Sequence, residues 1–292
     1  MDPLAFYTKS GALTGLGRHA PLADSLPADV GELCRIVQGI LIHDAWLQAY
    51  EVDAPRGRLQ ELHLRFVDAI LDRATELDDR PWTEPRPPDR RVIVCCRDFS
   101  VVLCALLKHK GISARARCGF ATYFGPGHYE DHWVCEHWSE EGGRWIATDA
   151  QLDALQRDRL GVEFDTLDLT AEQFVSGPRA WAMCRRGDAD PDSFGIADVH
   201  GLWFVRGNAL RDLAALNNQE VVPYLVLGVV GKSWDEWPMV AHPDRALPAP
   251  WLQLLDQIGE LSQHGDSAMP RLWSLFRQHA CLRPPAWMVT RA

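Results

Sequence analysis

The sequence is short of basic residues for its length. Only 30 of its 292 residues are lysine or arginine, whereas 40 are acidic, and the formal net charge is −10. Affinity for nucleic acid rests mainly on clustered lysines and arginines that neutralise phosphates. Here the basic residues are scattered along the chain, so we expect no nucleic-acid partner.

Long apolar runs are also absent. No stretch reaches the roughly 18 consecutive apolar residues that cross a bilayer as a helix. The first residues, MDPLAFYTKSGALTGLG, lack the basic start, the apolar segment and the small-residue cleavage site of a secretory signal. We therefore expect a cytoplasmic protein without a membrane partner.

Motifs that hold cofactors or metals are missing as well. Gly-Leu-Gly at 15–17 neither follows a clear strand nor precedes the lysine of a phosphate-binding loop. No Cys-x-x-Cys pair occurs, which argues against a metal site built from Cys95, Cys135 and His137. We expect no cofactor and no bound metal.

The chain does contain many cysteines and an ordinary share of core residues. It has eight cysteines, 47% hydrophobic residues and 24% charged residues. A chain of this size buries enough apolar surface without disulfides, and the expected compartment is reducing. We therefore expect most of the cysteines to be free thiols, several of them buried.

Hydrophobic periodicity predicts a mostly helical N-terminal region. Apolar residues recur at helical spacing within 29–50 and again within 59–74. The segment 80–91 then places four prolines in twelve residues and cannot continue a helix. Residues 1–90 are therefore interpreted as an N-terminal helical region that ends in a proline-rich connector.

The middle of the chain, residues 91–155, is interpreted as a core of one helix followed by strands. Helical spacing predicts a helix over about 97–110, with Gly111 as a left-handed cap. An alternating segment at 112–124 predicts a strand, and 132–138 and 144–150 predict a hairpin. With a two-residue loop at 141–142, Glu140 would pair with Gly143. In an antiparallel hairpin the numbers of every pair of opposed residues would then add up to 283.

Residues 156–292 are interpreted as a helix-rich region packed on this core. Thr170 and Gln173 have capping-box spacing, and 249–261 and 270–282 each carry a proline near the start of a helical pattern. The segment 201–220 could line a substrate cleft, but we favour a helix packed on the core with a solvated charged face. Its polar residues are Arg206, Asn208, Arg211 and Asp212.

Three residues of the core occur in an order that suits thiol chemistry. Cys96 begins the predicted helix, where free backbone amides and the helix dipole favour a thiolate. His132 and Asp149 stay on one face of the hairpin for any loop of even length, whereas His137 faces the other way and His128 lies in a loop. Cys96 is the expected nucleophile, His132 the base and Asp149 the group that orients the ring.

Simpler interpretations of the same residues stay open. Cys96 could be a buried cysteine at a helix start, and His132 a buried core histidine. Asp149 could cap the turn that follows it, and Asp153 lies on the same face. We interpret Asp98 as a charge in the first helical turn rather than a catalytic group.

Three sequence blocks carry a family resemblance. The stretch CCRDFSVVLCALLKHKGISARARCGF, the later DHWVCEHW and then GRWIATDA resemble the core of the transglutaminase-like superfamily of papain-like thiol enzymes. In that family a Cys-(Arg or Glu)-Asp-(Phe or Tyr) stretch opens the core helix, a His strand follows, and an Asp comes after a Trp. The resemblance covers residues 92–152, about a fifth of the chain.

The resemblance implies an α+β fold, with a helix packed on an antiparallel sheet as a transglutaminase-like (papain-like) core and helix-rich regions on either side. It implies a Cys96, His132 and Asp149 triad that forms a thioester with an acyl group and passes it to an amine or to water. The substrate would be a peptide, a protein or a small amide. The alternatives are a cysteine peptidase or amidase, and a non-catalytic peptide- or metabolite-binding module on the same fold.

Overall fold

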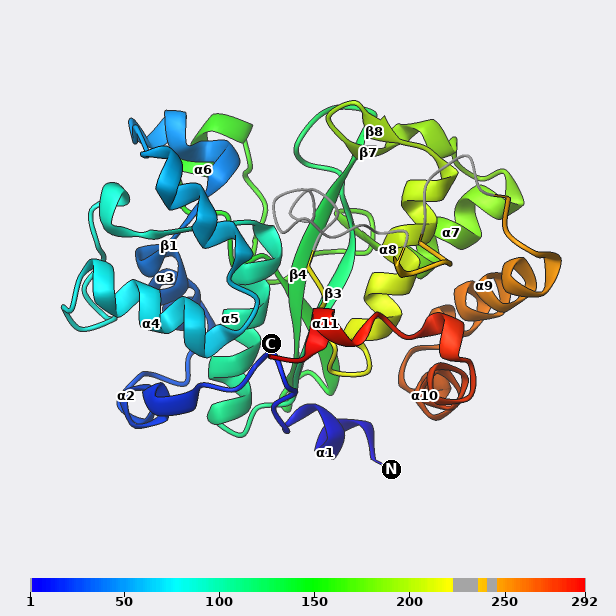
Figure 1. The fold of residues 1–292 in the computed structure, drawn as a ribbon, viewed down its shortest axis with the longest axis horizontal. Coiled ribbons are helices and arrows are strands. Elements are labelled where there is room, and N and C mark those ends of the chain that lie inside the picture. Colours follow the sequence, from blue (N-terminus) through cyan, green and yellow to red (C-terminus); the bar gives the residue numbers. More distant parts are fainter. Residues whose placement is uncertain (1, 223–235, 241–245, 292) are drawn as a thin grey trace. The chain divides into compact units, whose positions relative to one another are not determined.

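The computed structural model describes residues 2–222, 236–240 and 246–291 (Figure 1). It is an α+β protein in which helices pack with a mixed, mostly antiparallel sheet of six strands. The predicted fold class is confirmed at this level. The helices are α1 (Pro3–Tyr7), α2 (Ala20–Asp24), α3 (Val30–Ile40), α4 (Val67–Leu77), α5 (Cys96–His109), α6 (Ala154–Leu160), α7 (Gly177–Arg186), α8 (Leu202–Ala215), α9 (Ala249–Leu261), α10 (Met269–Gln278) and α11 (Ala286–Val289). The strands are β1 (Leu41–His43), β2 (Val92–Val94), β3 (Ala114–Ala121), β4 (Tyr129–Ser139), β5 (Arg144–Thr148), β6 (Phe174–Ser176), β7 (Phe194–Ile196) and β8 (Val199–His200).

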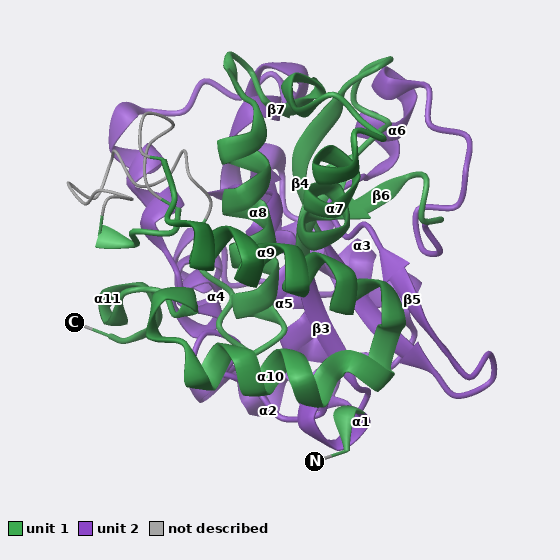
Figure 2. Cartoon of the chain, turned by 90° about the vertical axis from the view of Figure 1, so that its right-hand side faces the viewer, with its two compact units in different colours: residues 1–3, 117–133, 170–292 green, residues 4–116, 134–169 purple. Residues whose placement is uncertain are grey.

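The chain forms two compact units, each built from segments that are distant in sequence (Figure 2). Unit 1 contains residues 1–3, 117–133 and 170–292, and unit 2 contains residues 4–116 and 134–169. Strands β3 and β4 each contribute residues to both units.

Unit 2 is organised around α5. Residues 96–108 of this helix are all buried, and α2, α3 and α4 pack against it. A helix covered on every side needs apolar side chains all round, and the run from Phe99 to Leu107 supplies them. Gly111 follows the helix at φ +76°, the left-handed conformation that favours glycine. The predicted helix and its cap are therefore confirmed, with a start at Cys96.

Unit 2 also holds a pair of short parallel strands. Strands β1 and β2 pair in register from Leu41 opposite Val92 to His43 opposite Val94. The prediction of a helix over 29–50 is therefore wrong at 41–43, and the helical residues 44–50 that follow are a separate 3-10 helix. Asp29 caps α3 by accepting a hydrogen bond from the amide of Glu32, but the chain leaves the helix at Leu41 and becomes extended. Ile42 pairs with Ile93 of β2, and both are buried, as in strands of buried parallel sheets.

The hairpin of β4 and β5 confirms the predicted strand pairing. Cys135 pairs with Thr148 and Ser139 with Arg144, so the numbers of paired residues add up to 283 as expected. The loop between them includes Gly143 at φ +58°. The loop covers residues 140–143 and so has four residues instead of the expected two, but its even length preserves the predicted register.

Unit 1 combines sheet strands with the C-terminal helices. The strand order is β6-β3-β4-β7-β8, in which β4 and β7 are parallel and β3 and β6 antiparallel. Helix α7 packs against α8 and α9. A Cβ atom at Gly177 would lie 2.4 Å from the carbonyl carbon of Asn208, so α7 and α8 approach too closely there for any other residue.

Thr170 and Gln173 form the reciprocal hydrogen bonds of a capping box, but no helix follows them. The amide of Thr170 donates to Gln173, and the amide of Gln173 donates to the Thr170 hydroxyl. The chain then enters β6 rather than a helix. The same side-chain pattern thus closes a turn that leads into a strand.

The segment 201–220 contains α8, which packs on the core as favoured, but the prediction of a solvated charged face is wrong. Asp212 is fully buried and pairs with Arg117, 2.8 Å from Nε and 2.9 Å from Nη2. Asn208 donates to the carbonyl of Gly119 and to Asp131. Buried charges need such partners, and β3 and β4 provide them within unit 1.

Among the residues described, no helix is both long enough and apolar enough to span a membrane.

Candidate active site

The candidate nucleophile lies at the start of the central helix of unit 2. Cys96 is the first residue of α5, and the residue before it, Cys95, is the extended N-cap. The Cys96 side chain is largely buried, because the residue is only 8% exposed. The dipole of a 14-residue helix favours negative charge at this position.

Asp98 and Arg97 hold the helix start in place. The amide of Cys95 donates to the Asp98 carboxylate at 3.2 Å, and the amide of Asp98 donates to the carbonyl of Cys95 at 3.0 Å. Arg97 is fully buried and donates to Asp98 at 2.6 Å and to the carbonyl of Arg65 at 3.0 Å. Asp98 therefore acts as a capping charge in the first turn, as interpreted from the sequence.

A histidine that the sequence analysis did not consider contacts the Cys96 thiol. His43 ends β1 and lies opposite Val94, the last residue of β2, which leads directly into Cys95 and Cys96. The His43 side chain is hydrogen-bonded to Cys96. Parallel strands bring their carboxyl ends to the same edge, and this pairing is what places the imidazole beside the helix start.

The surroundings of His43 favour a positive charge on its ring. Its Nδ1 lies 3.0 Å from the Asp44 carboxylate, which favours the charged ring, whereas the amide of Ala45 donates to the same atom at 3.1 Å and favours the neutral one. Burial lowers the pKa of His43, but hydrogen bonds to Asp44 and Cys96 outweigh burial and raise it to about 9. An imidazolium at this position would stabilise a thiolate on Cys96.

Cys95 and Cys96 are not equivalent. A hydrogen bond to Cys96 raises the pKa of the Cys95 thiol well above its ordinary value, and burial and the nearby charge of Asp98 act in the same direction. The Cys95 thiol also donates to Asp98 at 3.3 Å. Cys95 therefore stays protonated as a donor, whereas Cys96 is the sulfur that faces an imidazole.

The predicted base, His132, lies in β4 and belongs to unit 1. It is 1% exposed, and its ring meets the rings of Phe124 and Tyr123 edge-on at 5.0 and 6.0 Å. Cys96 and Asp149 belong to unit 2. The triad of Cys96, His132 and Asp149 stays a prediction.

Asp149 follows β5 and makes local hydrogen bonds. Its carboxylate accepts from the amide of Gln151 at 2.8 Å, and its own amide donates to the carbonyl of Thr166 at 2.8 Å. The carboxylate thus caps the turn that follows, as the alternative interpretation allowed. Asp153, which the sequence analysis placed on the same face as Asp149, caps α6 by accepting a hydrogen bond from the amide of Gln156.

His43 was missed because it lies within a segment that was assigned to a helix. Two features of the sequence point to it. The apolar run that ends at Ile42 is followed by His43 and Asp44, and the apolar run 92–94 is followed by the two cysteines. Short buried strands read as such runs, and reactive side chains that follow two parallel strands meet at one edge.

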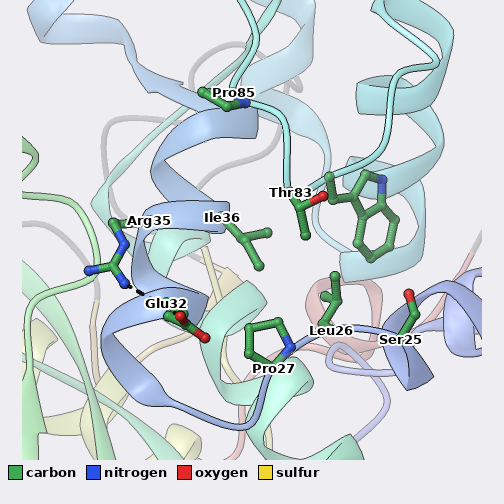
Figure 3. Close-up of a pocket in the computed structure, with 9 residues that line it drawn as sticks. Ser25, Leu26, Pro27, Glu32, Arg35, Ile36, Thr83 and Pro85 are labelled. Carbon is green, nitrogen blue, oxygen red and sulfur yellow. Dashed lines mark ion pairs between the residues drawn. The ribbon is translucent and has the colours of Figure 1, made fainter.

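A cavity of about 590 Å³ in unit 2 is separate from the thiol (Figure 3). It lies between the segment 25–27, helix α3 and the segment 82–85. Neither Cys96 nor His43 is among the residues that line it. In the portion of the chain that the structure covers, no group of three or more His, Cys, Asp or Glu residues is arranged to hold a metal ion.

Comparison of the chain with protein-family models, with curated proteins and with solved structures finds no match.

Proposed function

We propose that this chain is a transglutaminase-like thiol enzyme that acts on an amide or related acyl carbon through a thioester on Cys96. The observation that carries the proposal is the position of Cys96 at the first residue of α5 with its thiol hydrogen-bonded to His43. A thiol at a helix N-terminus beside an imidazole is the arrangement that activates cysteine nucleophiles. The three sequence blocks around Cys96, His132 and Asp149 support the same chemistry.

The reaction would proceed in two steps. The Cys96 thiolate attacks the acyl carbon, and the amide of Cys96 donates to the oxyanion that forms. The carbon–nitrogen bond then breaks, the leaving amine takes a proton from an imidazolium, and a thioester remains. In the second step an amine or water attacks the thioester, the imidazole takes the proton, and the thiolate is released.

Two histidines are candidates for the acid and base. His132 is supported by the family resemblance, which also assigns Asp149 as its partner. His43 is supported by its hydrogen bond to Cys96 and by Asp44, which lies 3.0 Å from its Nδ1. In our proposal His43 holds the thiolate in the resting enzyme, and His132 exchanges the proton with the substrate.

The proposal is tested by the reactivity of the individual thiols. Purified protein is treated with iodoacetamide at pH 7, and the rate of labelling is followed at each cysteine by peptide mass spectrometry. Cys184 and Cys281 are half-exposed, whereas Cys96 is buried. Exposure alone would make Cys96 the slowest of the three, so faster labelling of Cys96 supports an activated thiolate.

Slower labelling of Cys96 than of both half-exposed cysteines would reject the proposal and favour the second candidate, a non-catalytic module that binds a peptide or metabolite. If Cys96 is activated, a primary amine added with a library of glutamine-containing peptides separates the two enzyme classes. A transferase yields the amine conjugate, and a peptidase or amidase yields only the acid.

A further inference from the structure

A second cavity of unit 2, of about 470 Å³, has a different character from the first. Its walls come from helix α3, from the segment before β2 and from α6 with the residues that flank it. Its volume lies within the range of about 300 to 1,000 Å³ that is usual for small-molecule sites. The lining residues include Gln38, Thr166, Asp153 and three arginines, Arg35, Arg91 and Arg157.

The charged groups of this cavity leave it positive. Three guanidinium groups face one carboxylate, that of Asp153, for a formal charge of +2 in a protein whose net charge is −10. Arg35 has only a distant acidic neighbour, since its Nη2 lies 4.0 Å from Glu32, and Figure 3 shows this pair on α3. Guanidinium groups recognise carboxylates and phosphates through paired hydrogen bonds.

The Asp153 carboxylate is hydrogen-bonded to other partners and makes only a long ion pair with one of the arginines, Arg91. Its carboxylate accepts from the Tyr50 hydroxyl at 2.7 Å and from the amide of Gln156 at 3.1 Å. The Nη1 of Arg91 lies 3.9 Å from it, too far for a hydrogen bond. Arg91 is held instead by the carbonyl of Arg86, which accepts from its Nε at 3.0 Å, and by the ring of Tyr50.

Arg157 provides an independent sign of a missing partner. Its Nε is buried, and no hydrogen-bond acceptor for it exists among residues 2–222, 236–240 and 246–291. A buried donor without an acceptor destabilises the folded protein. Arg157 is therefore not held by a protein acceptor through this atom, and the positive charge of its guanidinium is available to an anion in the cavity.

The cavity is distinct from the proposed thiol site. Arg91 directly precedes β2 and Gly39 lies just before β1, so the cavity is at the amino ends of these parallel strands. Cys96 and His43 are at their carboxyl ends. A ligand in the cavity would therefore bind without touching the nucleophile.

We propose that this cavity binds a small molecule that carries at least two negative charges, a phosphate ester or a polycarboxylate. A phosphate monoester carries about −1.5 to −2 at neutral pH and matches the charge of the cavity. The ligand would bridge Arg35 on α3 and Arg157 on α6, with Arg91 beneath it.

The test uses the full chain with pyrophosphate and citrate as probes, titrated by calorimetry in buffer of low ionic strength at pH 7.5. Arg157→Gln should weaken binding by about tenfold or more, because it removes a charge-assisted hydrogen bond. Arg159→Gln is the matched control: it removes the same charge from the same helix at an exposed position that does not line the cavity. Binding by the control should stay within about twofold of wild type, since surface charges contribute little.

A second variant, Arg35→Gln, removes a charge of the cavity at an exposed position. Its affinity for the probes is the deciding measurement if Arg157→Gln lowers the melting temperature of the protein without a probe. Tighter binding of pyrophosphate assigns the site to phosphorylated ligands, and tighter binding of citrate assigns it to polycarboxylates. The proposal is rejected if neither probe binds the wild type. It is equally rejected if Arg157→Gln and Arg35→Gln both bind like the wild type, or if Arg159→Gln loses as much affinity as they do.

Discussion

At the scale of single residues, the two adjacent cysteines have different tasks. Cys95 caps α5 and keeps its proton because a hydrogen bond to Cys96, burial and the nearby charge of Asp98 all raise its pKa. Cys96 lies inside the first turn, and its thiol is hydrogen-bonded to His43. A redox role for the pair is not favoured, since both are free thiols.

This difference predicts an asymmetric pair of variants. Cys96→Ala should remove the fast phase of iodoacetamide labelling and all acyl transfer or hydrolysis. Cys95→Ala removes only a donor, so labelling of Cys96 should stay within about tenfold of wild type, the effect of one hydrogen bond. Peptide mapping of both variants is the measurement, and loss of the fast phase in Cys95→Ala with retention in Cys96→Ala would overturn the assignment.

The two histidines make separable predictions. His43→Gln removes the positive charge beside Cys96 and should slow alkylation at pH 7 by about tenfold or more. Because the pKa of His43 is raised to about 9, the wild-type advantage should persist up to that pH and shrink above it, as the ring loses its proton. The measurement is the alkylation rate of Cys96 from pH 6 to pH 10.

His132→Gln should lower the alkylation rate of Cys96 less than His43→Gln does. It should lower turnover more, because in our proposal His132 acts on the substrate. The control variant is His200→Gln, which changes an exposed histidine and should leave both the alkylation rate and turnover unchanged. Equal alkylation rates for His43→Gln and wild type at pH 7 would remove His43 from the site.

At the scale of elements, one buried carboxylate joins three parts of unit 2. Glu61, in the 3-10 helix η3 (Arg56–His63), accepts from the amide of Ile93 in β2 at 2.8 Å. It also pairs with Arg58 at 2.9 Å and with Arg73 of α4 at 2.9 Å. The edge of β2 is thereby satisfied by a side chain instead of a further strand, which keeps the two-stranded pair from extending.

Glu61→Gln should destabilise the protein by about 2 to 4 kcal/mol at pH 7, since it leaves two arginines without their carboxylate. Burial raises the pKa of Glu61, but the hydrogen bonds from Arg58 and Ile93 outweigh it and hold the pKa below its ordinary value of 4.5. The stabilisation is therefore present above pH 4.5 and is lost as the pH falls through the lower folded-state pKa.

The measurement is urea unfolding of wild type and variant at pH 7 and at several values below pH 4.5. The difference in unfolding free energy should narrow in acid as the wild-type carboxylate gains its proton. Glu84→Gln, at an exposed position of the proline-rich connector, should show no difference at either pH. A difference for Glu61→Gln that is constant over the whole range would contradict the pairing.

At the scale of the whole molecule, the eight cysteines are all free and most of them are buried. Two of them, Cys104 and Cys135, form a hydrogen-bonded pair in the core of unit 2, with their sulfurs 3.0 Å apart. Burial raises the pKa of Cys135 well above its ordinary value, and the hydrogen bond to Cys104 adds to this. The pair therefore contributes to packing as protonated thiols.

The chain should accordingly titrate eight thiols with Ellman's reagent in concentrated guanidinium, both before and after treatment with a reductant. The melting temperature should be the same with and without dithiothreitol, because no covalent cross-link stabilises either unit. A count of six before reduction, or a melting temperature that falls on reduction, would show that the 104–135 pair is oxidised in the protein.

Much of the local structure is determined by the sequence itself. Helical spacing and Gly111 were enough to predict α5, and alternation with a two-residue loop predicted the β4–β5 register. The place of Cys96 at a helix start and the capping role of Asp98 followed in the same way. These features depend on residues a few positions apart, whose geometry is set by backbone hydrogen bonds and side-chain periodicity.

Only the tertiary structure decided which distant side chains meet. It ended α3 at Ile40 and made β1 a strand, because pairing with β2 outweighed helical periodicity, and so it brought His43 to Cys96. It buried Asp212 against Arg117, where periodicity predicted a solvated face. Such contacts join residues some 50 to 100 positions apart, and whether they form depends on how elements pack and on the free energy of burying each charge with a partner.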